Sequence, residues 1–266
     1  MIVIGELING TRPSVAAAIA DRDADFIADL ARRQAEAGAD YVDCNSGRTG
    51  DAEAEDMAWL VETVKAATDR PVSLDSASPR AIAAGLDAWG EGSAPLINSV
   101  MLADEQLAAM LPMVAQSGGS VIALAHDDTD ADAEPERRLE IARALVERIT
   151  AAGISAERIF IDPVMSPVAT SAEAPGRTRR AIELIREALP ECHIVCGLSN
   201  VSFGLPARAL LNRTFLAQAV AAGLDAAILD PLDREIMRTI YAAEVLAGRD
   251  EWCLRYIEAH REGMLD

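Results

Sequence analysis

The feature that most limits what this chain can fold into is a regular alternation of short apolar runs with longer, helix-like stretches. The runs are rich in β-branched residues, and glycine or proline marks most of the joins. In the stretches between them, apolar residues recur at helical spacing, as Ile141, Leu145 and Ile149 do. The eight runs are Ile2–Gly5, Tyr41–Cys44, Pro71–Leu74, Pro95–Ile97, Ser120–Ala125, Arg158–Ile161, His193–Cys196 and Ala226–Leu229.

Strands that are apolar on both faces are typical of a parallel sheet covered by helices. Eight strand–helix units in 266 residues predict an α/β fold, a single (β/α)₈ TIM barrel that occupies residues 1–266 as one domain. A doubly wound open sheet is the alternative, and it is disfavoured because no Gly-x-Gly-x-x-Gly follows the first strand. Residues Asp250–Arg261 follow the eighth unit and predict an extra C-terminal helix.

The net charge of -19 limits the partners of the protein. A surface this acidic repels nucleic acid and anionic lipid, so we expect neither as a partner. No apolar run reaches the roughly 18 residues of a membrane span. The first residues, MIVIGELING, lack the basic region of a signal peptide, and we interpret them as a strand. The sequence therefore predicts a cytoplasmic protein.

Cysteine and histidine spacing predicts no metal site. The four cysteines form no Cys-x-x-Cys pair, and we expect them to be reduced and buried. His126, His193 and His260 lie far apart and lack the spacing of zinc ligands.

One acidic stretch, HDDTDADAEPERRLE, resembles the start of an EF-hand calcium loop. Ala133 and Leu139 stand where such a loop needs glycine and glutamate, so the match fails. We interpret the stretch as a solvated loop before a helix whose start Glu134 and Glu136 favour.

Nearly every apolar run is followed by a carboxylate, an amide or a hydroxyl. In a barrel these positions converge on the C-terminal rim, where catalytic groups lie. Each residue alone is as well explained as a helix N-cap or turn former, whereas the complete ring favours a site. The ring consists of Glu6, Asn9, Asp43, Asn45, Asp75, Ser76, Asn98, His126, Asp127, Asp162, Gly197, Ser199, Asn200 and Asp230.

Carboxylates and amides placed side by side offer paired hydrogen-bond acceptors and donors. Such groups suit the edge of a flat, nitrogen-rich heterocycle held in a cleft. Three aspartates could instead bind Mg²⁺, which is the alternative ligand for this ring.

Several stretches of the chain carry a family resemblance. They are GELINGTR, QAEAGADYVDCNSG, SLDSASPRAIAAGL, IDPVMSPVAT and CGLSNVSFGLPARALLNRTFLAQAVAAGLDAAILDPLD. Together they resemble the methyltetrahydrofolate:corrinoid protein methyltransferases of the pterin-binding TIM-barrel superfamily. The resemblance runs from Ile4 to the tail GRDEWCLRYIEAHREG, and the GLSNVSFGLP block is its most specific part.

The resemblance implies a (β/α)₈ barrel, often a homodimer, whose substrate is tetrahydrofolate or 5-methyltetrahydrofolate. The methyl group moves between N5 of the folate and the cobalt of a cobalamin. This chain has no Asp-x-His-x-x-Gly cobalamin loop, so the cobalamin is expected on a separate corrinoid protein. The same residues serve transfer in either direction.

The resemblance also implies roles for individual residues. Asn200 aligns with the catalytic amide of the family, which can donate or accept a hydrogen bond at N5. Asp43 matches an acidic position beside that amide. The positions matched to folate binding are Asp75, Asn98, Asp162, Gly197, Ser199, Asn200 and, less closely, Arg208. No role follows for Glu6, Asn9 or His126.

Alternatives remain open at the level of the sequence. Asn200 could be an Asx turn or an N-cap of the helix that follows Pro206. A dihydropteroate synthase is the nearest other enzyme, but its late lysine element is missing because Lys65 is the only lysine. A non-catalytic folate-binding protein is the third possibility, and it would not require Asn200.

Overall fold

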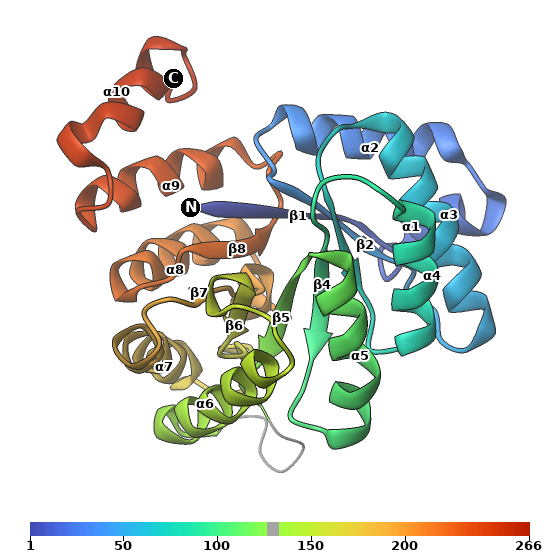
Figure 1. Ribbon diagram of the computed structural model, residues 1–266. Helices are drawn as coiled ribbons and strands as arrows, with labels where there is room; N and C mark the ends of the chain where they lie inside the picture. Colours follow the sequence, from blue (N-terminus) through green and yellow to red (C-terminus); the bar gives the residue numbers. More distant parts are fainter. Residues whose placement is uncertain (127–132) are drawn as a thin grey trace.

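The computed structural model describes residues 1–126 and 133–266 and confirms the predicted barrel (Figure 1). Within the described residues, eight parallel strands form one sheet in the order β7-β6-β5-β4-β3-β2-β1-β8. The strands are β1 (Ile2–Asn9), β2 (Tyr41–Asn45), β3 (Val72–Asp75), β4 (Leu96–Val100), β5 (Ser120–Leu124), β6 (Ile159–Asp162), β7 (His193–Ile194) and β8 (Ala226–Leu229).

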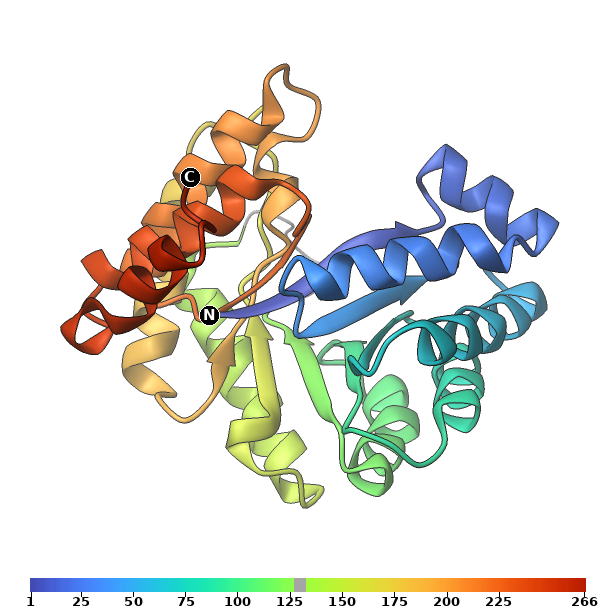
Figure 2. The same ribbon diagram turned by 90° about the horizontal axis from the view of Figure 1, so that it is seen from above.

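Helices cover the outside of the sheet, as the view along the barrel shows (Figure 2). Asp23, Ser78 and Asp233 begin α2, α4 and α9 as N-caps, each accepting a hydrogen bond from the first turn. The helices are α1 (Pro13–Asp21), α2 (Ala24–Glu36), α3 (Asp51–Ala67), α4 (Pro79–Trp89), α5 (Asp104–Ser117), α6 (Pro135–Ala151), α7 (Ala174–Ala188), α8 (Arg208–Ala222), α9 (Arg234–Leu246) and α10 (Leu254–Arg261). Short 3₁₀ turns are η1 (Ala156–Arg158), η2 (Leu198–Ser202) and η3 (Glu251–Cys253).

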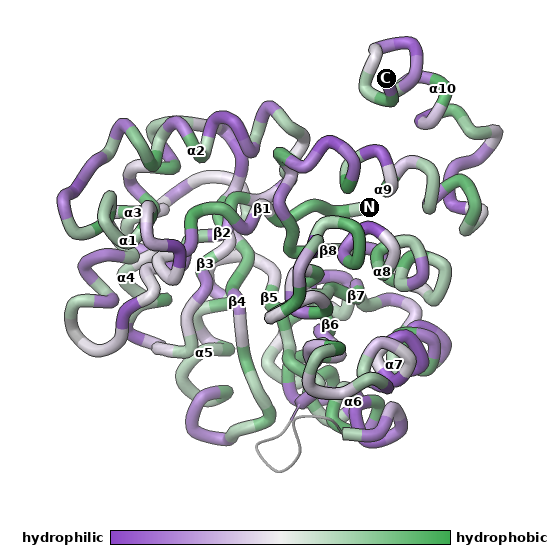
Figure 3. The backbone as a smooth tube through the Cα atoms, turned by 180° about the vertical axis from the view of Figure 1, so that it is seen from behind, coloured by the Kyte–Doolittle hydropathy of each residue, from purple (hydrophilic) through white to green (hydrophobic). Residues whose placement is uncertain are grey.

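The strands are apolar on both faces because they separate two cores, and Figure 3 shows the central strands as the mostly hydrophobic part of the chain. The larger core lies between the sheet and the helices and includes Val42, Leu74 and Ile161. The smaller core fills the barrel interior. Its buried members are Ile4, Leu96, Ile122, Phe160, Val195 and Ala226. The interior is therefore packed, and only its C-terminal end is left for a site.

An irregularity in β1 sets which of its side chains reach that end. The pairing with β2 shifts between Gly5 and Ile8, and the displaced N–H of Leu7 donates to Oε1 of the fully buried Gln34 at 2.9 Å. A Cβ at Gly5 would lie 2.5 Å from that oxygen, so only glycine fits. In a regular strand Glu6 and Asn9 would face opposite sides, whereas after the bulge both line the same hollow.

The extra C-terminal helix predicted over Asp250–Arg261 is present as α10, but it begins only at Leu254. The segment begins with η3, and Trp252 and Cys253 have left-handed φ angles of 58° and 56° that separate η3 from α10. The helix then runs from Leu254 and stands away from the barrel beyond α9 (Figure 1).

The other sequence predictions on local structure are mixed. Cys44, Cys192 and Cys196 are buried and Cys253 is partly exposed, and all four are free thiols. The solvated loop expected before α6 falls mainly on residues 127–132, outside the described residues, while α6 itself begins at Pro135. Across 1–126 and 133–266, no helix is long and apolar enough to cross a membrane.

The strand β7 is shorter than the predicted run His193–Cys196, and side-chain contacts help to close the barrel there. Gly197 pairs with Ile228 of β8 through one isolated bridge. Just before β8, Asp225 accepts hydrogen bonds from the backbone N–H of Ile194 at 2.7 Å and from Nδ1 of His193 at 3.0 Å. Burial alone would raise the pKa of Asp225, but these hydrogen bonds outweigh burial and lower it. Asp225 therefore ties β7 to β8 as a carboxylate.

Replacing Asp225 by alanine should lower the free energy of unfolding by about 1–2 kcal/mol at neutral pH, because Ile194 loses its acceptor in a half-buried site. The folded-state pKa lies below the ordinary value of 3.8, so this stabilisation is present above that pH and disappears as the pH falls through the folded pKa. Urea unfolding at several pH values measures it. Glu187→Ala, on the exposed face of α7, is the matched control and should change little. Equal losses in both variants would contradict the role.

Candidate active site

A hollow of about 530 Å³ opens at the C-terminal end of the strands. Of the eight residues given a catalytic or folate-binding role from the sequence, all except Asp162 line it. Of the other members of the strand-end ring, Asn45, Ser76, His126 and Asp230 do not line it, and Asp127 lies outside the described residues. The structure therefore brings most of the ring together at the barrel rim. The lining residues are Glu6, Asn9, Thr11, Arg12, Asp43, Asp75, Asn98, Gly197, Ser199, Asn200, Phe203, Arg208 and Ile228.

Asp43, which is buried, and Asp75, which is half-buried, form a carboxyl pair on the neighbouring strands β2 and β3. Ser73 donates to Oδ1 of Asp43 at 2.6 Å, and Asn45 donates to Oδ2 of Asp75 at 2.7 Å. Burial raises the pKa of both groups, and the charge of Asp75 raises the pKa of Asp43 further. Each of the two carboxyl groups affects the pKa of the other, and we infer that they titrate as a coupled pair.

Asn98 completes this side of the ring from β4. It is buried, and its Nδ2 lies 3.4 Å from Oδ1 of Asp43. The side of the hollow formed by β2, β3 and β4 therefore presents two carboxyl groups and an amide whose orientations are set by each other.

Asp162 lies beside the hollow rather than on its wall. It ends β6, is buried, and accepts a hydrogen bond from the backbone N–H of Val164 at 2.7 Å. It also accepts from the backbone N–H of Gly197, which does line the hollow. Burial raises the pKa of Asp162 to about 6, so the group is mostly ionised at neutral pH.

Asn200 lies in the middle of η2, not in an open loop. The interpretation of Asn200 as the cap of the next helix is wrong, because α8 begins at Arg208 with Ala207 as its N-cap residue. The Asn200 side chain is exposed, and its amide makes no hydrogen bond to any described residue. A Cβ at Gly197 would lie 3.0 Å from Nδ2 of Asn200, so glycine leaves room for this amide.

Arg208 holds η2 from the side of α8. Its Nη2 donates to the carbonyl oxygen of Ser199 at 2.6 Å, and its Nε donates to Oγ of Ser202 at 3.1 Å. The guanidinium also lies over the ring of Phe203, 5.9 Å from the centroid. In the described residues Arg208 thus supports the turn that carries Asn200, while still lining the hollow.

Five members of the predicted ring also behave as turn formers, because the side chain of each accepts a hydrogen bond from the backbone N–H two residues later. They are Asn9, Asn45, Ser76, Asp162 and Asp230, with distances of 2.7–2.9 Å. His126 is half-buried after β5 and does not line the hollow.

Sequence reasoning did not identify Thr11, Arg12, Phe203 or Ile228 as lining residues. Phe203 was available within the GLSNVSFGLP block, and Ile228 follows from the period of two along β8, which faces it inward. Arg12 reaches the hollow because its Nη2 donates to Oε1 of Glu6 at 3.0 Å, a contact that no local pattern encodes.

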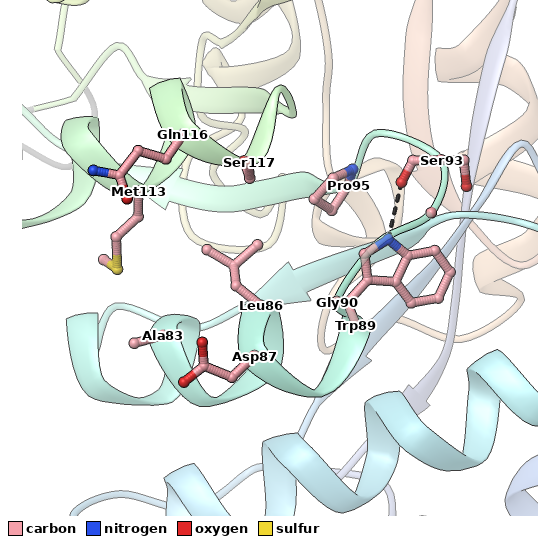
Figure 4. Close-up of a pocket in the computed structure, with 11 residues that line it drawn as sticks. Ala83, Leu86, Asp87, Trp89, Gly90, Ser93, Pro95, Met113, Gln116 and Ser117 are labelled. Atoms are coloured by element: carbon pink, nitrogen blue, oxygen red, sulfur yellow. Dashed lines mark hydrogen bonds between the residues drawn. The ribbon is translucent and has the colours of Figure 1, made fainter.

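A second hollow of about 300 Å³ lies between α4 and α5 (Figure 4). Trp89 forms part of its wall and donates from Nε1 to the carbonyl of Ser93 at 2.9 Å. Asp87 is its only carboxylate, and no residue of the strand-end ring reaches it. The converging carboxyl and amide groups place the candidate site in the barrel mouth.

Comparisons with known proteins agree with this placement. The sequence profile of the family described as "Pterin binding enzyme" matches residues 5–230. The chain is 35% identical over 267 residues to the methylcorrinoid:tetrahydrofolate methyltransferase of Eubacterium limosum, covering 100% of this chain and 98% of that protein. It is 33% identical over 243 residues to the methionine synthase of Mycobacterium tuberculosis, covering 86% of this chain but only 20% of that protein.

Solved structures show the same fold. The dihydropteroate synthase of Yersinia pestis superposes with a TM-score of 0.67 over 93% of both chains, at 17% sequence identity. At that identity the likeness concerns the fold alone.

The coupling between Asp43 and Asp75 can be measured. In Asp75→Asn the pKa of Asp43 should fall, because the neighbouring charge is removed while the burial of Asp43 remains. ¹³C NMR of labelled aspartate carboxyl groups reports the titration directly. Asp162→Asn is the control, since Asp162 does not act on Asp43 and should leave its titration unchanged. An unshifted Asp43 in Asp75→Asn would show that the two carboxyl groups titrate independently.

Proposed function

Since this chain belongs to the pterin-binding enzyme family, we propose that it is a methyltransferase acting between N5 of tetrahydrofolate and the cobalt of a separate corrinoid protein. The match to the methylcorrinoid:tetrahydrofolate methyltransferase extends over the whole chain, which supports that reaction. The single structural observation that carries the proposal is the exposed, unbonded amide of Asn200 at a hollow lined by buried carboxyl and amide groups.

The wall formed by Asp75 and Asn98 is proposed to hold the pterin ring of the folate. Pterin presents adjacent N–H donors and a carbonyl on one edge, which a carboxylate and an amide can satisfy together. Asp162 and the backbone at Gly197 lie next to this wall and are proposed to complete it. The hollow of about 530 Å³ is within the usual range for a small-molecule site.

The chemical difficulty of the reaction lies at N5. Transfer from the folate breaks the N5–methyl bond and forms a cobalt–methyl bond, and the nitrogen keeps the electron pair of the broken bond. A proton or a strong hydrogen bond at N5 offsets the negative charge that would otherwise develop there. The reverse transfer, from cobalt to folate, passes through the same transition state and uses the same groups.

Asn200 and Asp43 are the proposed catalytic residues. A neutral amide can donate or accept at N5 without exchanging its own proton, and the amide of Asn200 is not engaged elsewhere in the described residues. Burial and the charge of Asp75 raise the pKa of Asp43, which favours the protonated carboxyl group, the form that can donate a hydrogen bond.

The two alternative functions are less well supported. The dihydropteroate synthase likeness concerns the fold, and Lys65, the only lysine, lies in α3 with its ammonium donating to the carbonyl of Trp89, away from the mouth. A non-catalytic folate-binding protein gives no reason for an unengaged amide at Asn200.

Replacing Asn200 by alanine tests the catalytic role. We expect the methyl-transfer rate to fall about 10²- to 10³-fold, the range for loss of one transition-state hydrogen bond. Folate affinity should stay within about tenfold, because the pterin edge is held elsewhere. Stopped-flow absorbance of the cobalt, with excess corrinoid protein, measures the rate. An unchanged rate would remove Asn200 from the mechanism.

Asp75→Ala is the contrasting variant. Removing this acceptor leaves ring N–H donors unpaired in a buried site, so folate binding should weaken about 10- to 100-fold. Calorimetry measures the affinity. Normal affinity in Asp75→Ala would place the pterin somewhere else.

A homodimer and a cytoplasmic location complete the proposal. The segment beyond the barrel exposes large apolar side chains: Leu246 is 88% exposed, Trp252 80% and Leu254 62%. Such a group supports a contact with a second copy of the chain. Light scattering should find a dimer for the wild type and a monomer for Leu254→Glu, with Glu258→Gln as the control. Four free thiols are consistent with a reducing compartment.

A further inference from the structure

Glu6 and Ser199 form a contact that joins the first strand to the turn carrying Asn200. Oγ of Ser199 lies 2.9 Å and 3.0 Å from the two carboxylate oxygens of Glu6. The two residues are 193 positions apart in the chain, so this contact exists only when the barrel is closed. Burial raises the pKa of Glu6, while Ser199 and Arg12 oppose that effect.

Around Asn200, several polar groups of its neighbours in η2 form hydrogen bonds. Arg208 holds the carbonyl of Ser199, and Oγ of Ser202 donates to Oδ1 of Asn212 at 2.6 Å. Val201 accepts through its carbonyl from the N–H of Val168 at 3.0 Å. The turn is therefore tied on both sides while the Asn200 amide stays available.

We propose that Glu6 is a positioning residue for the methyl transfer, acting through Ser199 to hold η2 against β1 so that the amide of Asn200 faces the bound folate. This inference rests on the proposed function. The bulge in β1 belongs to the same arrangement, because it directs Glu6 into the mouth beside Asn9. Misplacing a reacting group by about 1 Å can cost up to about 100-fold in rate, which is why such a tie matters.

Direct contact between Glu6 and the folate is the competing explanation, because Glu6 lines the hollow. Its carboxylate, however, already accepts from Ser199 and from Arg12 at 3.0 Å. A group engaged in this way is better placed to hold η2 than to recognise a ligand. The two explanations predict different results when Asn200 is absent.

Hydrogen exchange of the wild-type chain and its variants tests whether the contact of Glu6 with Ser199 holds η2 in place. It needs no assay of activity. In Glu6→Ala and in Ser199→Ala, amide exchange in the segment 197–203 should speed up at least about tenfold, because η2 loses its anchor. Ser199→Thr keeps the hydroxyl and should restore slow exchange. Ser117→Ala, at the distant α4–α5 hollow, is the control and should leave the segment unchanged. Unchanged exchange in both test variants overturns the proposal.

The kinetic test is a double-mutant cycle with Asn200. Glu6→Ala should lower the methyl-transfer rate about 10- to 100-fold with folate affinity unchanged. Ser199→Ala should lower the rate to a similar extent, and Ser199→Thr should recover most of it. In the Asn200→Ala background, Glu6→Ala should cause no further loss. Additive losses, or a weaker folate affinity in Glu6→Ala, would instead assign Glu6 to the ligand.

The two tests separate the two proposals. A wild-type protein with no methyl transfer to or from any corrinoid protein would overturn the proposed function, and the exchange data would still show whether Glu6 holds η2. Normal transfer with unaltered exchange in the variants would overturn the positioning role of Glu6 and leave the proposed function standing.

Discussion

The parallel hydrogen bonding of eight strands into one ring is the constraint on which the rest of this structure depends. Because all strands run the same way, their C-terminal ends meet at a single mouth, and polar residues from distant parts of the sequence become neighbours. Between β7 and β8 the sheet is closed by one isolated bridge, by two backbone hydrogen bonds and by the side chain of Asp225. The contact of Glu6 with Ser199 joins β1 to the turn that follows β7. The candidate site thus lies next to the junction between β7 and β8.

Burial then gives these polar groups their chemical character. In water Asp43 and Asp75 would be two ordinary carboxylates, whereas inside the mouth burial raises the pKa of both and the charge of Asp75 raises the pKa of Asp43 further. The same burial raises the pKa of Asp162 to about 6, which leaves it mostly ionised at neutral pH. The mouth therefore offers both acceptors and a donor to a flat heterocycle, and a methyl transfer at N5 needs both kinds of group.

The turn η2 shows how a rigid frame can support one unengaged side chain. Glu6 and Arg208 hold Ser199 and Ser202, so the backbone is held in place on both sides of Asn200. None of these contacts uses the side-chain amide of Asn200. Such preorganisation lowers the entropy lost when a reacting group is aligned with its substrate. The fold and the proposed chemistry are connected at this turn.

The sequence by itself determined the barrel, because the alternation of apolar runs with helical periodicity is a local property that few folds satisfy. It also determined most of the ring, since strand-end positions and the GLSNVSFGLP block are legible along the chain. Only the tertiary structure decided the bulge at Gly5, the raised pKa of Asp43 beside Asp75 and the contact of Glu6 with Ser199. These features depend on distances between residues far apart in the chain, and local sequence patterns do not predict such distances.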